Sequence, residues 1–353
     1  MNADRIAVLV TAIGGGGHGE QILKALLHAE KGKYFIVGAD AQEHCPQFSW
    51  VDAHVVLPLA SDKDYITRVL EVCEKFDVKA VFHGCEPELK RFSAERSRFI
   101  DRGIFLPINP ADLIDVCMNK ELTNAKLLEL GFKAPKYIRV TQYQDLLAVD
   151  WFPVVVKPSV GAGGSANCFI AQSQDELIAL ATYLGFENIS TTFVIQEYVG
   201  TPEDEYTVGV LSDMDGNLIN SIAVRRLLSG GLNVRVSVPN RTERRDLGNK
   251  LVISSGVSHG YVGRFPAITK QCEAIAKSIG ARGAINIQCR VVDGEVMVFE
   301  INPRFSGTTS LRAMMGYNEP DVLMDIHLRG ARIETSFAFE EGYVLRGLVE
   351  YKL

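Results

Sequence analysis

Two oxygen-bearing side chains stand two positions apart at the end of an apolar run, within residues 298–304. Glu300 and Asn302 are therefore expected to point to the same face of a strand. Pro303 cannot donate to a sheet ladder and marks the end of that strand, which turns Arg304 back over the same face. Carboxylate and amide oxygens beside an arginine suit Mg²⁺ that bridges phosphates, because hard cations prefer oxygen ligands. The alternative interpretation is a strand that simply ends in polar residues.

The segment at residues 284–291 predicts a partner for this strand. Its odd positions are mostly apolar and its even positions mostly polar, and Asp293-Gly294 is a turn signal before the next strand. The second strand also keeps its bulkiest apolar residues at odd positions, so odd positions should oppose odd positions. This register favours an odd-length loop centred near Gly294 over a two-residue Asp-Gly turn.

The predicted register gathers oxygen atoms on one face of the hairpin. Gln288 is expected opposite Glu300, and Asn286 opposite Asn302. Three or four oxygen ligands would then converge on one site.

The composition limits the class of protein. A chain of 353 residues can form two or three domains, and its net charge of -6 gives no general attraction to nucleic acid. Seven cysteines, an odd number without CxxC or Cys/His spacing, favour a reducing compartment over a disulfide framework or zinc site. The apolar run at residues 6–13 is too short for a signal sequence, and no stretch approaches the roughly 20 apolar residues of a membrane span. We therefore expect a cytoplasmic protein with neither nucleic acid nor membrane as a partner.

The N-terminal third has the pattern of a doubly wound α/β domain. A β-branched strand at residues 5–11 leads through a glycine-rich turn into a helix at residues 21–30. The turn lacks the spacing of a dinucleotide-binding G-x-G-x-x-G, so a tight-turn or substrate-binding role is favoured for glycines 14–17. The loop at residues 83–88 follows another strand. Its carboxylates, Glu86 and Glu88, either hold a substrate amine or cap the next helix.

A second candidate site follows a change of pattern near residue 110. The buried strand at residues 152–159 delivers Lys157 to its end, directly before a glycine-rich loop at residues 161–167. Such a loop lets backbone N–H groups approach phosphate oxygens, and the lysine adds a full charge to the same anion. The spacing is not that of a P-loop, and an ordinary hairpin is the alternative. Arginines cluster further on, at positions 225, 226, 235, 241, 244 and 245, which suggests an anionic ligand or a solvated surface.

These motifs together resemble the ATP-grasp superfamily, in particular its carbamoyl-phosphate-synthase-like branch of carboxylate–amine ligases. The resemblance runs from about Lys120 to Tyr317 and rests on six pieces in the family's order. They are Asn119-Lys120, residues 156–164, residues 196–199 with 205–208, residues 256–260, residues 286–288 and residues 299–307. The resemblance implies an α/β fold made of a doubly wound domain that precedes a two-lobed ATP-grasp domain. We place the boundaries at residues 1–112 for the first domain, 113–195 for the small lobe and 196–353 for the large lobe.

The resemblance also implies a role for each matched residue. Lys120 and Lys157 would contact the phosphates or base of ATP, and the loop with Gly163, Gly164 and Ser165 would close over the phosphates. Adenine would be read at Glu197, Tyr198 and Val199, and the ribose at Glu205, while His259 would reach the nucleotide. Gln288, Glu300 and Asn302 would hold Mg²⁺, with two ions expected and Mn²⁺ as an alternative. Arg304 and Lys157 would act on the transferred phosphoryl group.

The reaction implied is attack of a small-molecule carboxylate on the γ-phosphate of ATP. The acyl phosphate then reacts with an amine. The resemblance also suggests a homodimer. The basic residues Arg225, Arg226, Arg235 and Arg304 are compatible with an acid that bears further anionic groups. Two alternatives stay open, which are a single-module enzyme that forms carbamoyl or carboxyl phosphate and a non-catalytic nucleotide-binding protein.

Overall fold

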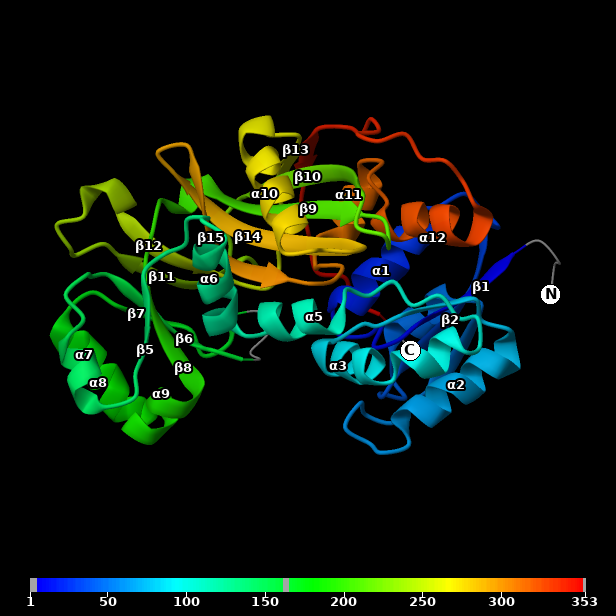
Figure 1. Cartoon of the computed structure of the whole chain (residues 1–353), viewed down its shortest axis with the longest axis horizontal. Coiled ribbons are helices and arrows are strands. Elements are labelled where there is room, and N and C mark those ends of the chain that lie inside the picture. Colours follow the sequence, from blue (N-terminus) through cyan, green and yellow to red (C-terminus); the bar gives the residue numbers. More distant parts are fainter. Residues whose placement is uncertain (1–4, 161–164, 352–353) are drawn as a thin grey trace.

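The structure is a computed structural model that describes residues 5–160 and 165–351 (Figure 1). Its N-terminal part is a parallel four-stranded sheet in the order β3-β2-β1-β4. Helix α1 packs on one face of strand β1 and helix α2 on the other, so the doubly wound arrangement is confirmed. The elements are β1 (Ile6–Val10), α1 (His18–Leu27), β2 (Tyr34–Asp40), η1 (Pro46–Trp50), β3 (Ala53–Val56), α2 (Tyr65–Phe76), β4 (Ala80–Phe82), α3 (Glu86–Ala94) and α4 (Arg96–Ile100).

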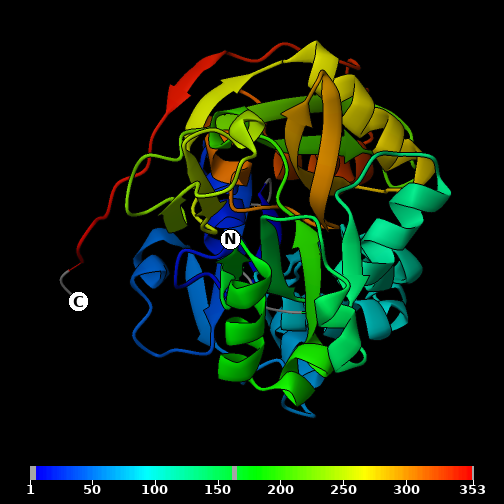
Figure 2. The ribbon, with the colours of Figure 1, turned by 90° about the vertical axis from the view of Figure 1, so that its left-hand side faces the viewer.

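A smaller lobe follows two connecting helices, α5 (Ala111–Cys117) and α6 (Lys120–Glu129). Its antiparallel sheet has the order β5-β8-β6-β7, and its helices share a core with one face of that sheet. Figure 2 shows this lobe below the strands of the large lobe. The elements are β5 (Tyr137–Arg139), α7 (Tyr143–Leu147), β6 (Val154–Pro158), β7 (Phe169–Ala171), α8 (Gln174–Leu184), α9 (Phe186–Thr192) and β8 (Phe193–Glu197). Strand β8 crosses the boundary placed between residues 195 and 196, and the domain boundaries themselves stay a prediction.

The large lobe is a six-stranded sheet in the order β15-β14-β9-β10-β13-β16, with a separate hairpin of β11 and β12. Helix α10 packs on one face of the sheet. Its strands are β9 (Glu205–Ser212), β10 (Leu218–Arg226), β11 (Val234–Pro239), β12 (Lys250–Ser254), β13 (Gly260–Gly263), β14 (Ala284–Val292), β15 (Glu295–Asn302) and β16 (Gly342–Val344). Its helices are η3 (Pro202–Asp204), η4 (Arg245–Leu247), α10 (Pro266–Ser278), α11 (Thr309–Met314) and α12 (Glu319–Arg329).

The hairpin of β14 and β15 has the predicted pairing but not the predicted loop. Gln288 pairs with Glu300, and Asn286 with Asn302, as expected. The prediction of an odd-length loop was wrong, because Val292 pairs with Glu295 across a two-residue Asp-Gly turn with φ values of 50° and 80°. A β-bulge between Gln288 and Cys289 restores the register, since it adds one residue to β15. The pairing of odd with odd positions predicted the wrong loop length because it assumed a hydrogen-bonded ladder without a bulge.

The N-terminal part and the large lobe share one core. Residues of β1 and α1 lie in the same buried cluster as residues of α11 and α12 (Figure 1). Polar contacts also join the two parts, because the Asn109 side chain donates to the carbonyl oxygens of Ala284 and Pro303, each at 3.0 Å. Pro303 directly precedes Arg304, so this contact fixes the end of β15 against the N-terminal part.

Candidate active site

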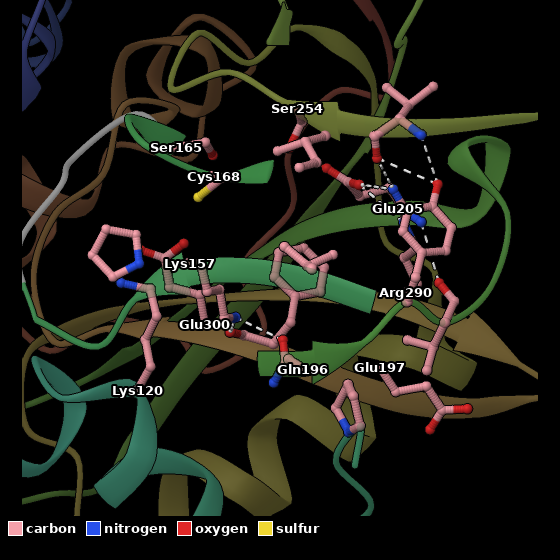
Figure 3. Close-up of a pocket in the computed structure, with 18 residues that line it drawn as sticks. Lys120, Lys157, Ser165, Cys168, Gln196, Glu197, Glu205, Ser254, Arg290 and Glu300 are labelled. Atoms are coloured by element: carbon pink, nitrogen blue, oxygen red, sulfur yellow. Dashed lines mark hydrogen bonds and ion pairs between the residues drawn. The ribbon is translucent and has the colours of Figure 1, made fainter. Parts of the chain in front are cut away.

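A pocket lies between the small-lobe sheet and the large lobe (Figure 3). We call it the inter-lobe pocket. Strands β6 and β8 form one wall, strand β12 and the β14–β15 hairpin form the other, and both lysines that the sequence singled out line it. Its lining residues are Lys120, Pro135, Val155, Lys157, Pro158, Ser165, Cys168, Gln196, Glu197, Tyr198, Val199, Glu205, Val252, Ile253, Ser254, Arg290, Phe299 and Glu300.

Lys120 is placed by the residue before it. The Asn119 side chain accepts hydrogen bonds from the N–H groups of Glu121 and Leu122, at 2.9 and 3.2 Å, and so caps helix α6. The Lys120 N–H donates to the Ser159 carbonyl at 2.9 Å, which ties the helix to the end of the lysine-bearing strand β6. The Asn-Lys pair therefore starts a helix and directs its first side chain into the inter-lobe pocket.

Lys157 is buried at the centre of this pocket. Its Nζ donates to Gln196 Oε1 at 2.6 Å and to the Phe299 carbonyl at 3.0 Å (Figure 3). Burial lowers the pKa of Lys157 to about 8, and the charge of Lys120 adds to this effect while Glu300 opposes it. The two ammonium groups of Lys120 and Lys157 make this part of the pocket suited to a phosphate chain.

Two arginines hold Glu205 from both sides. Arg226 Nη1 lies 3.1 Å from Glu205 Oε1, and Arg290 Nη2 lies 2.9 Å from Glu205 Oε2 (Figure 3). Burial would raise the pKa of Glu205, but the Arg290 and Arg226 guanidinium groups outweigh it and hold that pKa below its ordinary value. Glu205 is therefore an ionised carboxylate with its orientation fixed.

Arg290 also shapes the segment where adenine was expected. Its Nη1 donates to the Val199 carbonyl at 3.2 Å, its Nη2 to the Val252 carbonyl at 2.7 Å, and its guanidinium carbon lies 4.5 Å from the centre of the Tyr198 ring. In the part of the chain that the structure describes, the Val199 N–H has no hydrogen-bond partner. One backbone donor is thus left free at the edge of the pocket.

A second, more polar pocket adjoins the first, and Ser165 and Glu300 line both. We call it the polar pocket. The N-terminal part forms one side of it and the large lobe the other. It is lined by residues 15–18, residues 84–87, Ser165, Thr207, residues 255–258, Asn286, Gln288, Glu300, Asn302, Arg304 and residues 306–308.

The candidate metal ligands lie together in the polar pocket. Gln288 Nε2 donates to Glu300 Oε2 at 3.1 Å, and Asn302 Oδ1 accepts from Arg304 Nη2 at 2.9 Å. Asn286 is more fully engaged by the protein, because its Oδ1 accepts from both Arg312 at 2.6 Å and Thr207 at 2.8 Å. Among the residues described, no group of three or more His, Cys, Asp or Glu side chains is placed to hold a metal ion. One carboxylate with two amides fits a hard cation that takes its other ligands from phosphate and water.

The two carboxylates of the loop before α3 have different surroundings. Glu88 is buried and accepts from Tyr65 Oη at 2.6 Å, Thr11 Oγ1 at 2.7 Å and the Gly84 N–H at 2.8 Å. It therefore holds the loop in place. Glu86 instead lines the polar pocket, and its Oε1 lies 2.7 Å from Arg304 Nη2. The structure thus gives the two carboxylates different surroundings, while the choice between a substrate amine and helix capping stays a prediction.

Comparison with known proteins supports one fold for this arrangement. A family model described as "PylC-like, N-terminal domain" matches residues 8–107, and one described as "ATP-grasp in the biosynthetic pathway with Ter operon" matches residues 254–346. The large chain of carbamoyl phosphate synthase from Thermoplasma acidophilum is 24% identical over 263 residues, which are 71% of this chain and 24% of that protein. The chain therefore spans about a quarter of the length of this relative.

Two solved structures have the same architecture over most of the chain. The biotin carboxylase domain of Hydrogenobacter thermophilus 2-oxoglutarate carboxylase, a dimer in complex with MgADP and bicarbonate, has a TM-score of 0.63 and 14% identity. That comparison covers 94% of this chain and 71% of the other. L-amino acid ligase from Bacillus licheniformis has a TM-score of 0.63 and 17% identity, over 93% of this chain and 75% of the other. This chain has the ATP-grasp fold.

The ATP-grasp fold brings most of the candidate residues to the two adjoining pockets. Lys120, Lys157, Ser165, Glu197, Tyr198, Val199 and Glu205 line the inter-lobe pocket, Gln288, Asn302 and Arg304 line the polar pocket, and Glu300 lines both. Gly163 and Gly164 lie outside the described residues.

Other candidates lie outside these pockets. His259 lines neither pocket, and its ring nitrogens contact Asn233 Nδ2 at 2.8 Å and the Arg346 N–H at 3.4 Å. Arg225, Arg226 and Arg235 line neither pocket, so their compatibility with an acid that bears further anionic groups stays a prediction. Arg226 neutralises Glu205 instead. A run of arginines in sequence does not indicate which of them share a face.

Sequence reasoning missed Arg290 as a residue of the ATP-grasp site. A signal was present, since Arg290 follows Asn286 and Gln288 at even positions of one strand and so shares their face. No helix in the described ranges combines the length and apolar character that a bilayer span requires.

Proposed function

We propose that this chain is an ATP-dependent ligase that activates a small-molecule carboxylate as an acyl phosphate and joins it to an amine. The observation that carries the proposal is the position of Glu300. This carboxylate lines both the inter-lobe pocket, which Lys120 and Lys157 also line, and the polar pocket beside Arg304. A triphosphate lying in the first pocket would therefore present its terminal phosphate to the second.

The chain's own residues supply binding and charge neutralisation. Lys120 and Lys157 would bind phosphate oxygens, Glu205 would accept from the ribose hydroxyls, and the free Val199 N–H would donate to the adenine ring. Arg304 would stabilise the reacting carboxylate and the transferred phosphoryl group, because both carry negative charge that must come together. Gly163, Gly164 and Ser165 are proposed to cover the phosphates and exclude water.

Gln288, Glu300 and Asn302 would hold Mg²⁺, which supplies further charge neutralisation at the phosphates when bound. Their oxygen donors fit Mg²⁺, and we extend the proposal to two ions, with Mn²⁺ as a substitute. His259 is left out of the proposed nucleotide site because both of its ring nitrogens are engaged elsewhere.

The reaction balances without a protein nucleophile. A carboxylate oxygen attacks the γ-phosphorus and ADP leaves, which gives the acyl phosphate. The amine nitrogen then attacks the acyl carbon, phosphate leaves, and the amine gives up a proton. Small carboxylates and amines are therefore the proposed partners. We also propose that the chain forms a homodimer and that it acts in the cytoplasm.

A hydroxylamine trap tests the proposal. Protein, Mg·ATP and hydroxylamine are mixed with pools of amino acids, hydroxy acids and sugar acids, and hydroxamate and ADP are measured together. The proposal predicts ADP and hydroxamate in one pool. It also predicts that Glu300→Ala and Asn302→Ala each lower the rate by about 100-fold or more without unfolding the protein. Glu295→Ala is the matched control, because Glu295 is exposed at the opposite end of the same strand.

Two other outcomes would contradict the proposal. ADP formation that depends on bicarbonate, without hydroxamate, would favour the carboxyl phosphate alternative. The similarity to carbamoyl phosphate synthase large chains makes that alternative the second candidate. Nucleotide binding without turnover in any pool would favour a non-catalytic protein.

A further inference from the structure

The polar pocket contains few charged groups. Among its described lining residues the charged side chains are Glu86, Glu300 and Arg304. Most of the others are glycines or residues with hydroxyl or amide side chains. His18 also lines the pocket, but burial, with Arg304 and His83 nearby, holds its pKa well below the ordinary value, so this imidazole is uncharged at neutral pH. The pocket therefore does not fit an acid that carries several additional anionic groups.

Glu86 and Arg304 form an ion pair that a substrate would disturb. Their side chains are 23% and 11% exposed, and the distance from Oε1 to Nη2 is 2.7 Å. The proposed function directs the Arg304 guanidinium toward the substrate carboxylate and the phosphoryl group. Glu86 would then share its partner with a competing anion.

No other group in the pocket can replace that partner. Glu86 Oε2 has no hydrogen bond to any described residue, so Arg304 is the side chain that holds this carboxylate. Of the other cations that lower the Glu86 pKa, Lys120 lines the inter-lobe pocket and also a small cavity that it shares with Glu86, and Lys90 lines neither of the two main pockets. Among the described residues, Arg304 is the cation that lies within 4.0 Å of the Glu86 carboxylate. A partly buried carboxylate that loses its partner destabilises the complex unless a new cation takes its place.

We propose that Glu86 receives an ammonium group of the acid that is activated, so that the substrate is an amino acid. The inference rests on the proposed function, because it assigns Arg304 to the carboxylate of the same molecule. An amino acid carries its ammonium and carboxylate groups a few bonds apart, and adjacent Glu86 and Arg304 side chains match that separation. Substrate binding would replace the Glu86–Arg304 ion pair with two others. One would join Glu86 to the substrate ammonium group, and the second would join Arg304 to the substrate carboxylate.

Glu88 is the internal contrast for this assignment. It lies two residues along the same helix, but its carboxylate is already held by three donors of the protein, namely Thr11, Tyr65 and Gly84. It is also not among the lining residues of the polar pocket. Only Glu86 of the two presents a carboxylate oxygen to a ligand.

Matched pairs of acids test the proposal in the hydroxylamine trap. Each amino acid is compared with the 2-hydroxy acid that has the same side chain, such as alanine with lactate and aspartate with malate. We expect hydroxamate from an amino acid, and a kcat/KM lower by about 100-fold for its hydroxy analogue, since a neutral hydroxyl cannot form an ion pair with the Glu86 carboxylate. This comparison uses the unaltered protein and so does not depend on the folding of a variant.

Variants of Glu86 provide a second readout. Glu86→Gln should raise the KM for the amino acid and reduce the preference over the hydroxy acid to less than about tenfold, while Glu86→Asp should restore part of it. Glu95→Gln is the control, because Glu95 is the exposed C-cap of the same helix and should leave the preference unchanged.

The outcomes separate this inference from the proposed function. Hydroxamate from an acid without an amino group, at a rate equal to that from its amino analogue, would overturn the inference alone. A preference that persists in Glu86→Gln would also overturn it. Failure to form hydroxamate from any acid would overturn the proposed function, and the inference with it.

Discussion

Arg290 donates from both Nε and Nη2 to one oxygen of Glu205, at 3.1 and 2.9 Å. Both side chains are almost completely buried, and Arg226 holds the second oxygen of the same carboxylate. The same Arg290 guanidinium reaches the Val199 and Val252 carbonyls, which lie on separate segments around the inter-lobe pocket. One side chain therefore joins Glu205, the segment at Val199 and strand β12 into a single wall.

Removal of Arg290 should affect stability and nucleotide binding together. Arg290→Met leaves Glu205 with one cation in a buried site, so we expect a loss of about 3 kcal/mol in the free energy of unfolding. The affinity for ATP should fall more than tenfold, because the wall of the pocket loses its orientation. Urea unfolding and calorimetric titration measure the two effects. Arg225→Met is the control, since its 4.0 Å pair with Asp204 is exposed and should be worth less than about 1 kcal/mol.

Lys157 should make ATP binding depend on pH above about 8. Burial lowers its pKa to about 8, and bound phosphates favour the charged form, so the dissociation constant should rise toward tenfold per pH unit above that value. Titrations between pH 7 and 9.5 measure this slope. Lys157→Arg keeps the charge throughout this range and should flatten the profile. An equal slope in that variant would show that another group is responsible.

The effect of Lys157 on folding stability should have the opposite pH dependence to its effect on ATP affinity. Its folded pKa lies below the ordinary value of 10.5, so the unfolded chain binds more protons between about pH 8 and 10.5. The contribution of Lys157 to stability should therefore rise with pH across that window. Comparison of unfolding curves for the unaltered protein and Lys157→Met, in which the rise should disappear, isolates this contribution.

Gly84 permits a close approach of two backbone segments beside the polar pocket. A Cβ at this position would lie 1.9 Å from the Thr11 carbonyl oxygen and 2.9 Å from the Gly19 Cα. Neither atom belongs to a flexible side chain, so Gly84→Ala should destabilise the protein by about 3 kcal/mol or more. Thermal unfolding measures the change. Gly231→Ala, where a Cβ would meet no atom within 4 Å, should change stability by less than about 0.5 kcal/mol.

Glu88 should behave as a structural residue. Glu88→Gln keeps the size of the side chain but replaces an acceptor with an amide donor in a site that offers three donors, so we expect a loss of about 2 kcal/mol. The preference among acids in the trap should not change. Glu74→Gln, on the exposed face of α2, controls for the loss of one negative charge. An altered acid preference with unchanged stability would contradict the assignment.

The sequence was most informative where structure depends on neighbouring residues. Strand alternation predicts that Gln288, Glu300 and Asn302 share one face, because side-chain direction follows from local backbone geometry. The length of the loop between β14 and β15 was predicted wrongly, because a β-bulge depends on how two strands pair and has no local sequence signature here. The order of motifs was sufficient to indicate the fold, which the structural comparisons confirm.

Tertiary structure decided which polar residues meet. Arg290 reaches Glu205 from 85 residues away, and Arg304 reaches Glu86 from 218 residues away. Neither separation in sequence constrains a distance in space. The pairing of β14 with β9 places Arg290 opposite Glu205, whereas the core that the N-terminal part shares with the large lobe brings Arg304 to Glu86. The sequence by itself therefore determined the kinds of groups available, which are two lysines near a glycine-rich loop and a set of carboxylate and amide oxygens on one face of a hairpin. The folded chain determined which carboxylate is structural, which is left for a ligand, and which arginines are already neutralised.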